Sequence, residues 1–209
     1  EMSKEQLVKR MLSMNSHVDS QKIRTGNLED EDWDRLVGSV RRIGNSHLVI
    51  DDTSGITATE LRSKCRKLKI EQGLDLVIID YLQLMSGSGK RKGENRQQEI
   101  SEISRSLKVM ARELNVPVIA LSQLSRAVEQ RPDKKPMLSD LRESGAIEQD
   151  ADMVMFLYRD EYYNPDTEDK NLAECIVAKN RSGETGMFKL GWKGEYTKFS
   201  NVEFALKEE

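Results

Sequence analysis

The pattern of apolar and polar positions along the chain predicts alternating strands and helices. Short apolar runs, which are typical of strands, occupy residues 47–51, 76–79, 116–121, 153–158, 173–178 and 187–193. The runs at 76–79 and 116–121 are unbroken and rich in branched side chains. Runs of this kind are typical of strands that are buried on both faces of a parallel sheet. We therefore expect these two strands to lie at the centre of the fold.

Apolar residues three and four positions apart predict helices between these runs. The predicted helices begin near Ser3, Asp30, Thr57 and Arg96. Ser3 precedes Gln6 by three residues, which is the spacing of a capping box. The helix over residues 30–43 has an apolar stripe made of Trp33, Leu36, Val37, Val40 and Ile43. The longest helix is predicted from about Arg96 to Leu114.

The order of these elements predicts an α/β fold. A strand at 47–51, a helix from Thr57 to Gly73 and a strand at 76–79 predict a βαβ unit with parallel strands. We expect a mostly parallel sheet flanked by helices, with late antiparallel strands around a turn at 179–184. The polar connection at 124–150 shows little periodicity, and so long a connection is usually functional or mobile. No domain boundary is evident, so residues 1–209 are expected to form one domain.

Composition restricts the classes of function. The 209 residues suffice for a substantial core, and a net charge of -3 argues against a uniformly basic surface for nucleic acid. Cys65 and Cys175 are far apart and without metal-ligand spacing, which favours reduced cysteines in the cytoplasm. His17 and His47 are isolated, which makes a zinc site improbable. The sequence contains no apolar stretch long enough for a membrane span and no signal peptide. Glu1, rather than an initiator Met, suggests a fragment of a longer protein.

Polar side chains follow the predicted strands where a shared ligand could bind. Asp80 follows the strand at 76–79, Gln123 follows the strand at 116–121, and Lys179 and Arg181 follow a later one. Ligands of open α/β folds bind outside the carboxyl ends of parallel strands. A carboxylate for Mg²⁺, an amide that senses the terminal phosphate and cations for developing charge are what phosphoryl transfer needs. A simpler interpretation is that Asp80 belongs to an ordinary turn and that Lys179 and Arg181 are solvated cations of another turn.

Two basic loops favour a nucleic-acid backbone as a ligand. The first carries Lys90, Arg91 and Lys92, and the second begins near Arg126 and extends to Arg142. Cations on such loops suit single-stranded DNA, because charge neutralisation supplies affinity without reading sequence. Neither loop contains interleaved aromatic residues, so base stacking is not expected. Each loop alone is equally consistent with a solvated charged surface.

The motifs as a set resemble a known family. They comprise residues 1–3, 75–84 (DLVIIDYLQL), 121–126 (LSQLSR), 139–152 (SDLRESGAIEQDAD) and 178–183 (AKNRSG). In this order they resemble the C-terminal motor domain of the bacterial replicative DNA helicases of the DnaB family. The resemblance covers nearly the whole chain, and 139–152 is its most discriminating part. It implies a RecA-like fold in a hexameric ring that hydrolyses ATP with Mg²⁺ at subunit interfaces. Such a ring moves 5′ to 3′ on single-stranded DNA and unwinds duplex at the replication fork, within a primosome that includes a primase and a helicase loader.

The resemblance also implies roles for individual residues. Glu1 would polarise the attacking water. Asp80 would coordinate Mg²⁺, and Gln123 would couple the state of the phosphate to the DNA loops. Lys179 and Arg181 would reach into the nucleotide site of a neighbouring subunit, as arginine fingers do. A segment formed by Arg142, Glu143 and Gly145 would contact the DNA backbone, through the guanidinium of the arginine and the exposed main chain of the glycine.

One feature of the family's motor is missing. No GxxxxGK[S/T] phosphate loop occurs in the sequence, and Gly87-Ser88-Gly89-Lys90 has the wrong spacing and follows the wrong strand. We therefore expect a motor domain without its first strand, its phosphate loop and the N-terminal domain of the family, and with weak nucleotide binding of its own. Another RecA-like ATPase and a non-catalytic DNA-binding adaptor that lost its phosphate loop remain the alternatives.

Overall fold

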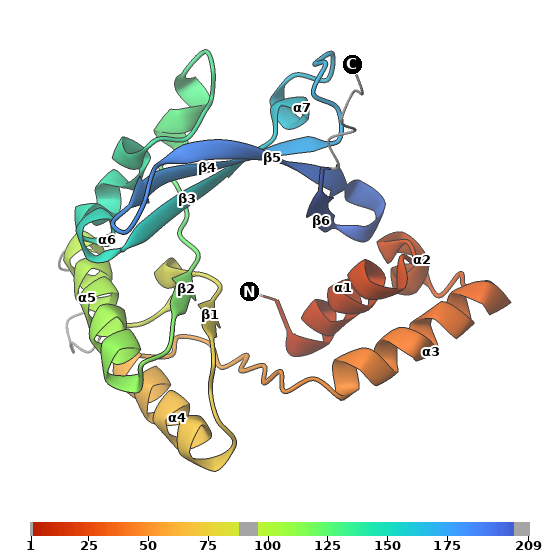
Figure 1. Ribbon diagram of the computed structural model, residues 1–209, viewed down its shortest axis with the longest axis horizontal. Coiled ribbons are helices and arrows are strands. Elements are labelled where there is room, and N and C mark those ends of the chain that lie inside the picture. Colours follow the sequence, from red (N-terminus) through yellow and green to blue (C-terminus); the bar gives the residue numbers. More distant parts are fainter. Residues whose placement is uncertain (1, 88–95, 203–209) are drawn as a thin grey trace. The chain divides into compact units, whose positions relative to one another are not determined.

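The computed structural model describes residues 2–87 and 96–202, with the backbone alone for 142–144 (Figure 1). The helices are α1 (Lys4–Ser16), α2 (Ser20–Thr25), α3 (Asp30–Gly44), α4 (Ala58–Glu71), α5 (Arg96–Leu114), α6 (Gly145–Asp150) and α7 (Asp160–Tyr163), with 3₁₀ helices η1 (Leu82–Leu84), η2 (Arg126–Gln130), η3 (Leu138–Ser144) and η4 (Gly194–Tyr196). The strands are β1 (Val77–Ile79), β2 (Val118–Ala120), β3 (Met153–Tyr158), β4 (Leu172–Asn180), β5 (Gly186–Lys193) and β6 (Lys198–Asn201). The chain groups into two compact units, one of residues 1–52, 157–175 and 187–209 and one of residues 53–156 and 176–186.

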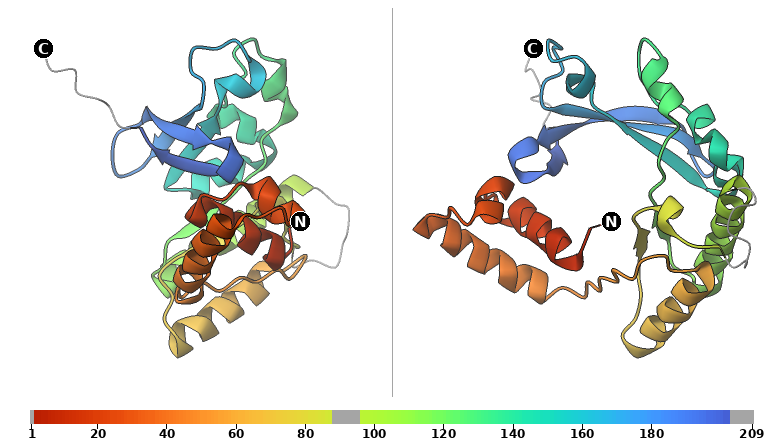
Figure 2. Two further views of the ribbon diagram at one scale, coloured as in Figure 1. Left: turned by 90° about the vertical axis from the view of Figure 1, so that its right-hand side faces the viewer. Right: turned by 180° about the vertical axis from the view of Figure 1, so that it is seen from behind.

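In the first unit, α1 and α3 lie side by side (Figure 1, Figure 2). The capping box predicted at the start of α1 is present, because the Ser3 hydroxyl accepts from the Gln6 N–H and the Gln6 amide oxygen accepts from the Ser3 N–H. The apolar stripe predicted on α3 is only partly used, since Leu36 is buried while Trp33 and Val37 are exposed. The prediction of the helix is confirmed, but its apolar face is not a core face in this structure.

In the second unit, β1 and β2 are parallel, with Val77 opposite Val118, and α5 connects them. The βαβ unit is therefore β1–α5–β2. The predicted unit at 47–79 was wrong, because residues 47–51 form no strand. Their apolar side chains, such as Val49, are exposed, and an apolar run becomes a strand only where another strand pairs with it.

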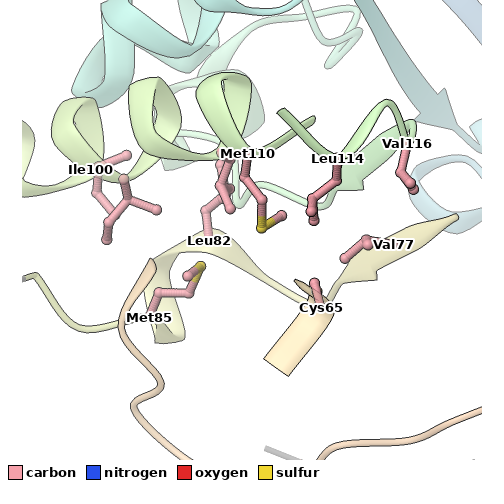
Figure 3. Close-up of a cluster of buried hydrophobic side chains, with 10 residues drawn as sticks. Cys65, Val77, Leu82, Met85, Ile100, Met110, Leu114 and Val116 are labelled. Carbon is pink, nitrogen blue, oxygen red and sulfur yellow. The ribbon is translucent and has the colours of Figure 1, made fainter. Parts of the chain in front are cut away.

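The core of this second unit lies between α4, α5 and the β1–η1 segment (Figure 3). Its buried members are Cys65, Val77, Leu82, Met85, Ile100, Ile103, Leu107, Met110, Leu114 and Val116. The strands β1 and β2 are covered on one face only: Val77 is buried, whereas Ile78 is 62% exposed and Ile119 is 43% exposed. The prediction that both strands are buried on both faces was therefore wrong for this chain. The sequence pattern shows that these strand residues are apolar, but they are buried only where another layer of the fold covers them.

The remaining strands form a second sheet in the order β3-β4-β5-β6, and β5 and β6 are antiparallel. The predicted strands at 153–158, 173–178 and 187–193 are confirmed, and the turn predicted around 179–184 lies between β4 and β5. The structure adds elements that were not predicted, namely α2, α7, β6 and the 3₁₀ helices η1 and η4. It also places η2, η3 and α6 in the 124–150 connection, where the sequence shows little periodicity. The mixed α/β fold itself is as predicted.

Candidate functional site

Asp80 and Gln123 lie at the carboxyl ends of the paired strands β1 and β2. The strand pairing continues past both strands, because the Leu121 N–H donates to the Ile79 carbonyl and the Leu82 N–H donates to the Leu121 carbonyl, each at 2.9 Å. Asp80 is exposed, and within the described residues no group donates a hydrogen bond to its carboxylate. A free carboxylate at this edge suits Mg²⁺, which proteins bind through one or two carboxylates together with substrate phosphates.

The side chain of Gln83 holds the main chain of Gln123. Its amide oxygen accepts from the Gln123 N–H at 3.2 Å, and its amide nitrogen donates to the Gln123 carbonyl at 3.4 Å and to the Ser122 hydroxyl at 3.1 Å. The segment that carries Asp80 is thereby joined directly to the segment that carries Gln123. Sequence reasoning gave Gln83 no role, and the only signal for it was its place within the DLVIIDYLQL motif.

Arg96, the first residue of α5, supports Gln83 in turn. Its guanidinium donates to the Gln83 carbonyl at 2.5 Å and pairs with Glu99 one turn further along the helix. The Glu99 carboxylate also accepts from the Gly87 N–H. The hydrogen bond from Arg96 is the main cause of a lowered Glu99 pKa, and the Gly87 N–H adds to it. The predicted DNA-binding residues Lys90, Arg91 and Lys92 lie outside the described residues.

Lys179 and Arg181 lie together at the end of α6. The ammonium of Lys179 donates to the Glu148 carbonyl, and the guanidinium of Arg181 donates to the Gln149 carbonyl. These are carbonyls of the last turn of α6, which lack partners within the helix. Cations are also favoured there by the helix dipole. No hydrogen bond or ion pair among the described residues joins this pair to Asp80 or Gln123, so the structure brings the predicted residues together in two separate pairs.

The residues expected to contact DNA, Arg142, Glu143 and Gly145, lie at the end of η3 and the start of α6. Within η3, the Asp140 carboxylate is buried and accepts two hydrogen bonds from Arg131, at 2.9 and 2.6 Å, and one from the Met137 N–H at 2.8 Å. Hydrogen bonding to Asp140 is the main cause of a raised Arg131 pKa. Gly145 is exposed, and a Cβ there would meet no described atom within 4 Å.

Other predicted residues receive less support from the structure. Arg126 is exposed at the start of η2, while Glu1 lies outside the described residues. The side chains of Arg142 and Glu143 are likewise not described. In residues 2–87 and 96–202, no three His, Cys, Asp or Glu side chains gather in a way that could hold a metal ion. No helix within those residues has the length and apolar character to cross a membrane.

A hollow of about 300 Å³ lies elsewhere, in the first unit. It is lined by Asn171, Gly191, Trp192, Lys193, Glu195 and Ser200. None of the residues predicted for phosphoryl transfer or DNA contact is among them. The pairs described above, rather than this hollow, are therefore the candidate site.

Comparison with known proteins finds relatives that all belong to one family. The family model described as the DnaB-like helicase C terminal domain matches residues 1–201. The chain is 59% identical over 203 residues to the replicative DNA helicase DnaC of Bacillus subtilis (strain 168), covering 97% of this chain and 44% of that protein. It is also 59% identical over 208 residues to the replicative DNA helicase DnaB of Geobacillus stearothermophilus, covering 100% of this chain and 46% of that protein. The chain thus spans less than half the length of these relatives.

Solved structures of similar fold agree. One solved ATPase domain superimposes with a TM-score of 0.93 at 47% identity, covering 97% of this chain and 72% of that chain. A DnaB-like replicative helicase, studied for its interactions with primase, gives the same TM-score and identity and covers 97% of this chain and 49% of that chain. Such high TM-scores at this identity mean that the chain shares the fold of these two structures.

Proposed function

Because the chain belongs to the family of DnaB-like helicase C-terminal domains, we propose that it forms part of the ATP-driven motor of a replicative DNA helicase. In this proposal the motor couples ATP hydrolysis to 5′ to 3′ translocation on single-stranded DNA and to duplex unwinding at the replication fork. The observation that carries the proposal is the edge where Asp80 and Gln123 follow two parallel strands and are joined by Gln83.

At this edge Asp80 would hold Mg²⁺, and its exposed carboxylate, to which no described group donates, fits that role. The metal would neutralise developing charge on the phosphates. Gln123 follows β2 on the neighbouring strand, where its amide could sense the terminal phosphate. Its main chain is fixed by Gln83, so its position is set by the segment that carries Asp80. Glu1 would orient the attacking water. The phosphate loop would be supplied by residues outside this sequence.

Lys179 and Arg181 would serve the nucleotide of a neighbouring subunit in a hexameric ring. The support is that the described contacts hold this pair on α6, apart from Asp80 and Gln123. DNA would be bound by the segment of Arg142, Glu143 and Gly145, with Arg126 and the Lys90–Lys92 loop adding backbone charge. A primase and a helicase loader would be further partners, consistent with the relative studied for its interactions with primase.

The metal role is tested in the full-length parent protein with Asp80→Asn. The matched control is Asp75→Asn, an exposed aspartate just before β1 on the same segment. We expect the first variant to lose DNA-stimulated ATP hydrolysis and unwinding of a duplex with a 5′ tail, while the second retains both. Wild-type turnover in Asp80→Asn would refute the proposed role of this edge.

The trans arrangement is tested by mixing subunits. The Asp80→Asn protein is expected to be inactive and the Arg181→Ala protein to keep only a low residual turnover, but a ring assembled from both contains some interfaces with an intact Asp80 and an intact partner Arg181. We therefore expect ATP turnover to return in mixed rings and to depend on the mixing ratio. Absence of any recovery, in rings shown by native mass spectrometry to be mixed, would place both groups on one nucleotide and contradict the proposal.

A further inference from the structure

Asp152 contacts Arg181 at two points, one through its main chain and one through its side chain. Its main-chain carbonyl accepts from the Arg181 N–H at 2.9 Å, and its carboxylate lies 3.5 Å from Nη1 of Arg181. A contact to the main chain fixes where the arginine leaves the β4–β5 turn. A contact to the guanidinium limits the directions in which the long side chain can point.

Asp152 is itself fixed by α5. The ammonium of Lys108 donates to its carboxylate, and the Lys108 side chain is mostly buried, at 19% exposed. This hydrogen bond is the main cause of a lowered Asp152 pKa, with charge–charge contributions from Lys108, Arg181 and Arg112. The carboxylate therefore stays ionised at neutral pH. A fixed negative charge beside Arg181 is the arrangement expected of a group that orients it.

The last turn of α6 makes a further contact with the Arg181 guanidinium. The Gln149 carbonyl accepts from Nη2 of Arg181, while Asp152 lies near Nη1. Arg181 remains 47% exposed. A guanidinium has five N–H donors in a rigid fork, so these contacts leave donors free for a phosphate. These contacts thus orient the Arg181 side chain and leave some of its N–H donors available to a ligand.

The same short helix connects this support to the segment expected to contact DNA. α6 begins at Gly145, in that segment, and its last turn holds Lys179 and Arg181. A shift of α6 along its axis would move the carbonyls that bind both cations. DNA binding at one end of α6 could therefore change the position of the cations at the other end.

We propose that Asp152 is a positioning residue for Arg181, and that Asp152 and the last turn of α6 together set the direction in which Arg181 meets a phosphate of the neighbouring subunit. This inference rests on the proposed function of Arg181. Asp152 acts only through the arginine in this scheme. It need not touch nucleotide, metal or DNA, so its removal should change turnover without changing the affinity for single-stranded DNA.

The test is a double-mutant cycle in the full-length hexamer with Asp152→Asn, Arg181→Ala and the double variant. The asparagine keeps the size of the side chain and the main-chain contact, which limits structural damage. The matched control is Glu184→Gln, on the β4–β5 turn that also carries Arg181. Among the described residues, the Glu184 carboxylate makes no contact with Arg181. The readouts are kcat and KM for ATP with and without single-stranded DNA, the Kd for single-stranded DNA, and ring size by sedimentation.

We expect Asp152→Asn to lower the DNA-stimulated kcat about tenfold, with an unchanged Kd and an intact ring, because a misdirected cation loses most of its stabilisation of the transition state. In the Arg181→Ala background the same change should have no further effect on kcat. Additive effects, or unchanged turnover in Asp152→Asn, would overturn the inference. Wild-type turnover in Arg181→Ala would instead overturn the proposed function of Arg181.

Discussion

Replacement of Leu82 by Ala should destabilise the protein strongly, because Leu82 anchors the turn that follows Asp80. Its side chain is 2% exposed and belongs to the core between α4 and α5 (Figure 3). Leu84 provides a control within the same 3₁₀ turn, since its side chain is 39% exposed. The two variants remove the same atoms from the same element and differ only in what surrounds them.

The expected magnitude follows from burial. Cutting a buried leucine side chain to a methyl group loses about 2–2.5 kcal/mol of transfer free energy, at about 0.8 kcal/mol per methylene. The cavity left in a close-packed core adds about 1–1.5 kcal/mol. Leu82→Ala should therefore lower the free energy of unfolding by about 3–4 kcal/mol. At Leu84 the loss should be about 1 kcal/mol, because more of the side chain is already in water and no closed cavity forms.

The assay is equilibrium urea unfolding of both variants and the unmodified chain, followed by circular dichroism. A lower midpoint with an unchanged slope reports a true loss of stability. Equal and small losses in the two variants would show that the core around Leu82 is not packed as described. A large loss at Leu84 as well would mean that the turn itself, and not burial, carries the stability.

Three further outcomes are expected. In the full-length protein, Arg142→Ala should weaken binding of single-stranded DNA equally across sequences and reduce the salt slope by about 0.7–1, measured by fluorescence anisotropy, whereas an unchanged slope would exclude a phosphate contact. Gln83→Leu should lower DNA-stimulated kcat without changing DNA affinity, because the Gln123 main chain loses its support; a normal kcat would contradict this. A carboxyl group with a lowered folded-state pKa stabilises the fold above its ordinary pKa of about 4.3 and loses that contribution as pH falls through the lowered value. Glu99→Gln should therefore reduce the acid dependence of unfolding below that pH, and an identical pH profile would show that Arg96 does not stabilise the fold through this carboxylate.

Local signals were sufficient to predict most helices. The helix at Arg96–Leu114 was predicted with its bounds because its apolar face recurs at helical spacing along its whole length. The capping box at Ser3 marked one helix start correctly, since the residues that form it are close in the sequence. Capping and periodicity depend on neighbours along the chain, and this is why a single sequence reveals them.

Burial and side-chain support were not predictable in this way. Ile78 lies in an unbroken apolar run, but its exposure depends on whether another layer covers that face of β1. The contact of Gln83 with Gln123 joins residues 40 positions apart. The contact of Lys108 with Asp152 joins residues 44 positions apart. Such contacts leave no periodic trace, and glutamine and lysine are common on solvated surfaces, so the motif around Gln83 was the only signal for either residue.

The described contacts separate the candidate site into two supported groups, and this separation has a functional consequence. Gln83 ties Gln123 to the strand end that carries Asp80, whereas Lys179 and Arg181 are tied to α6. A motor that completes each site with cations from a neighbouring subunit needs one chain to present these groups to two different nucleotides. Both groups are nevertheless anchored to α5, because Arg96 of that helix donates to the Gln83 carbonyl and Lys108 of the same helix donates to Asp152. Under the proposed function, α5 would therefore connect the strand edge at one nucleotide with the cations at the other.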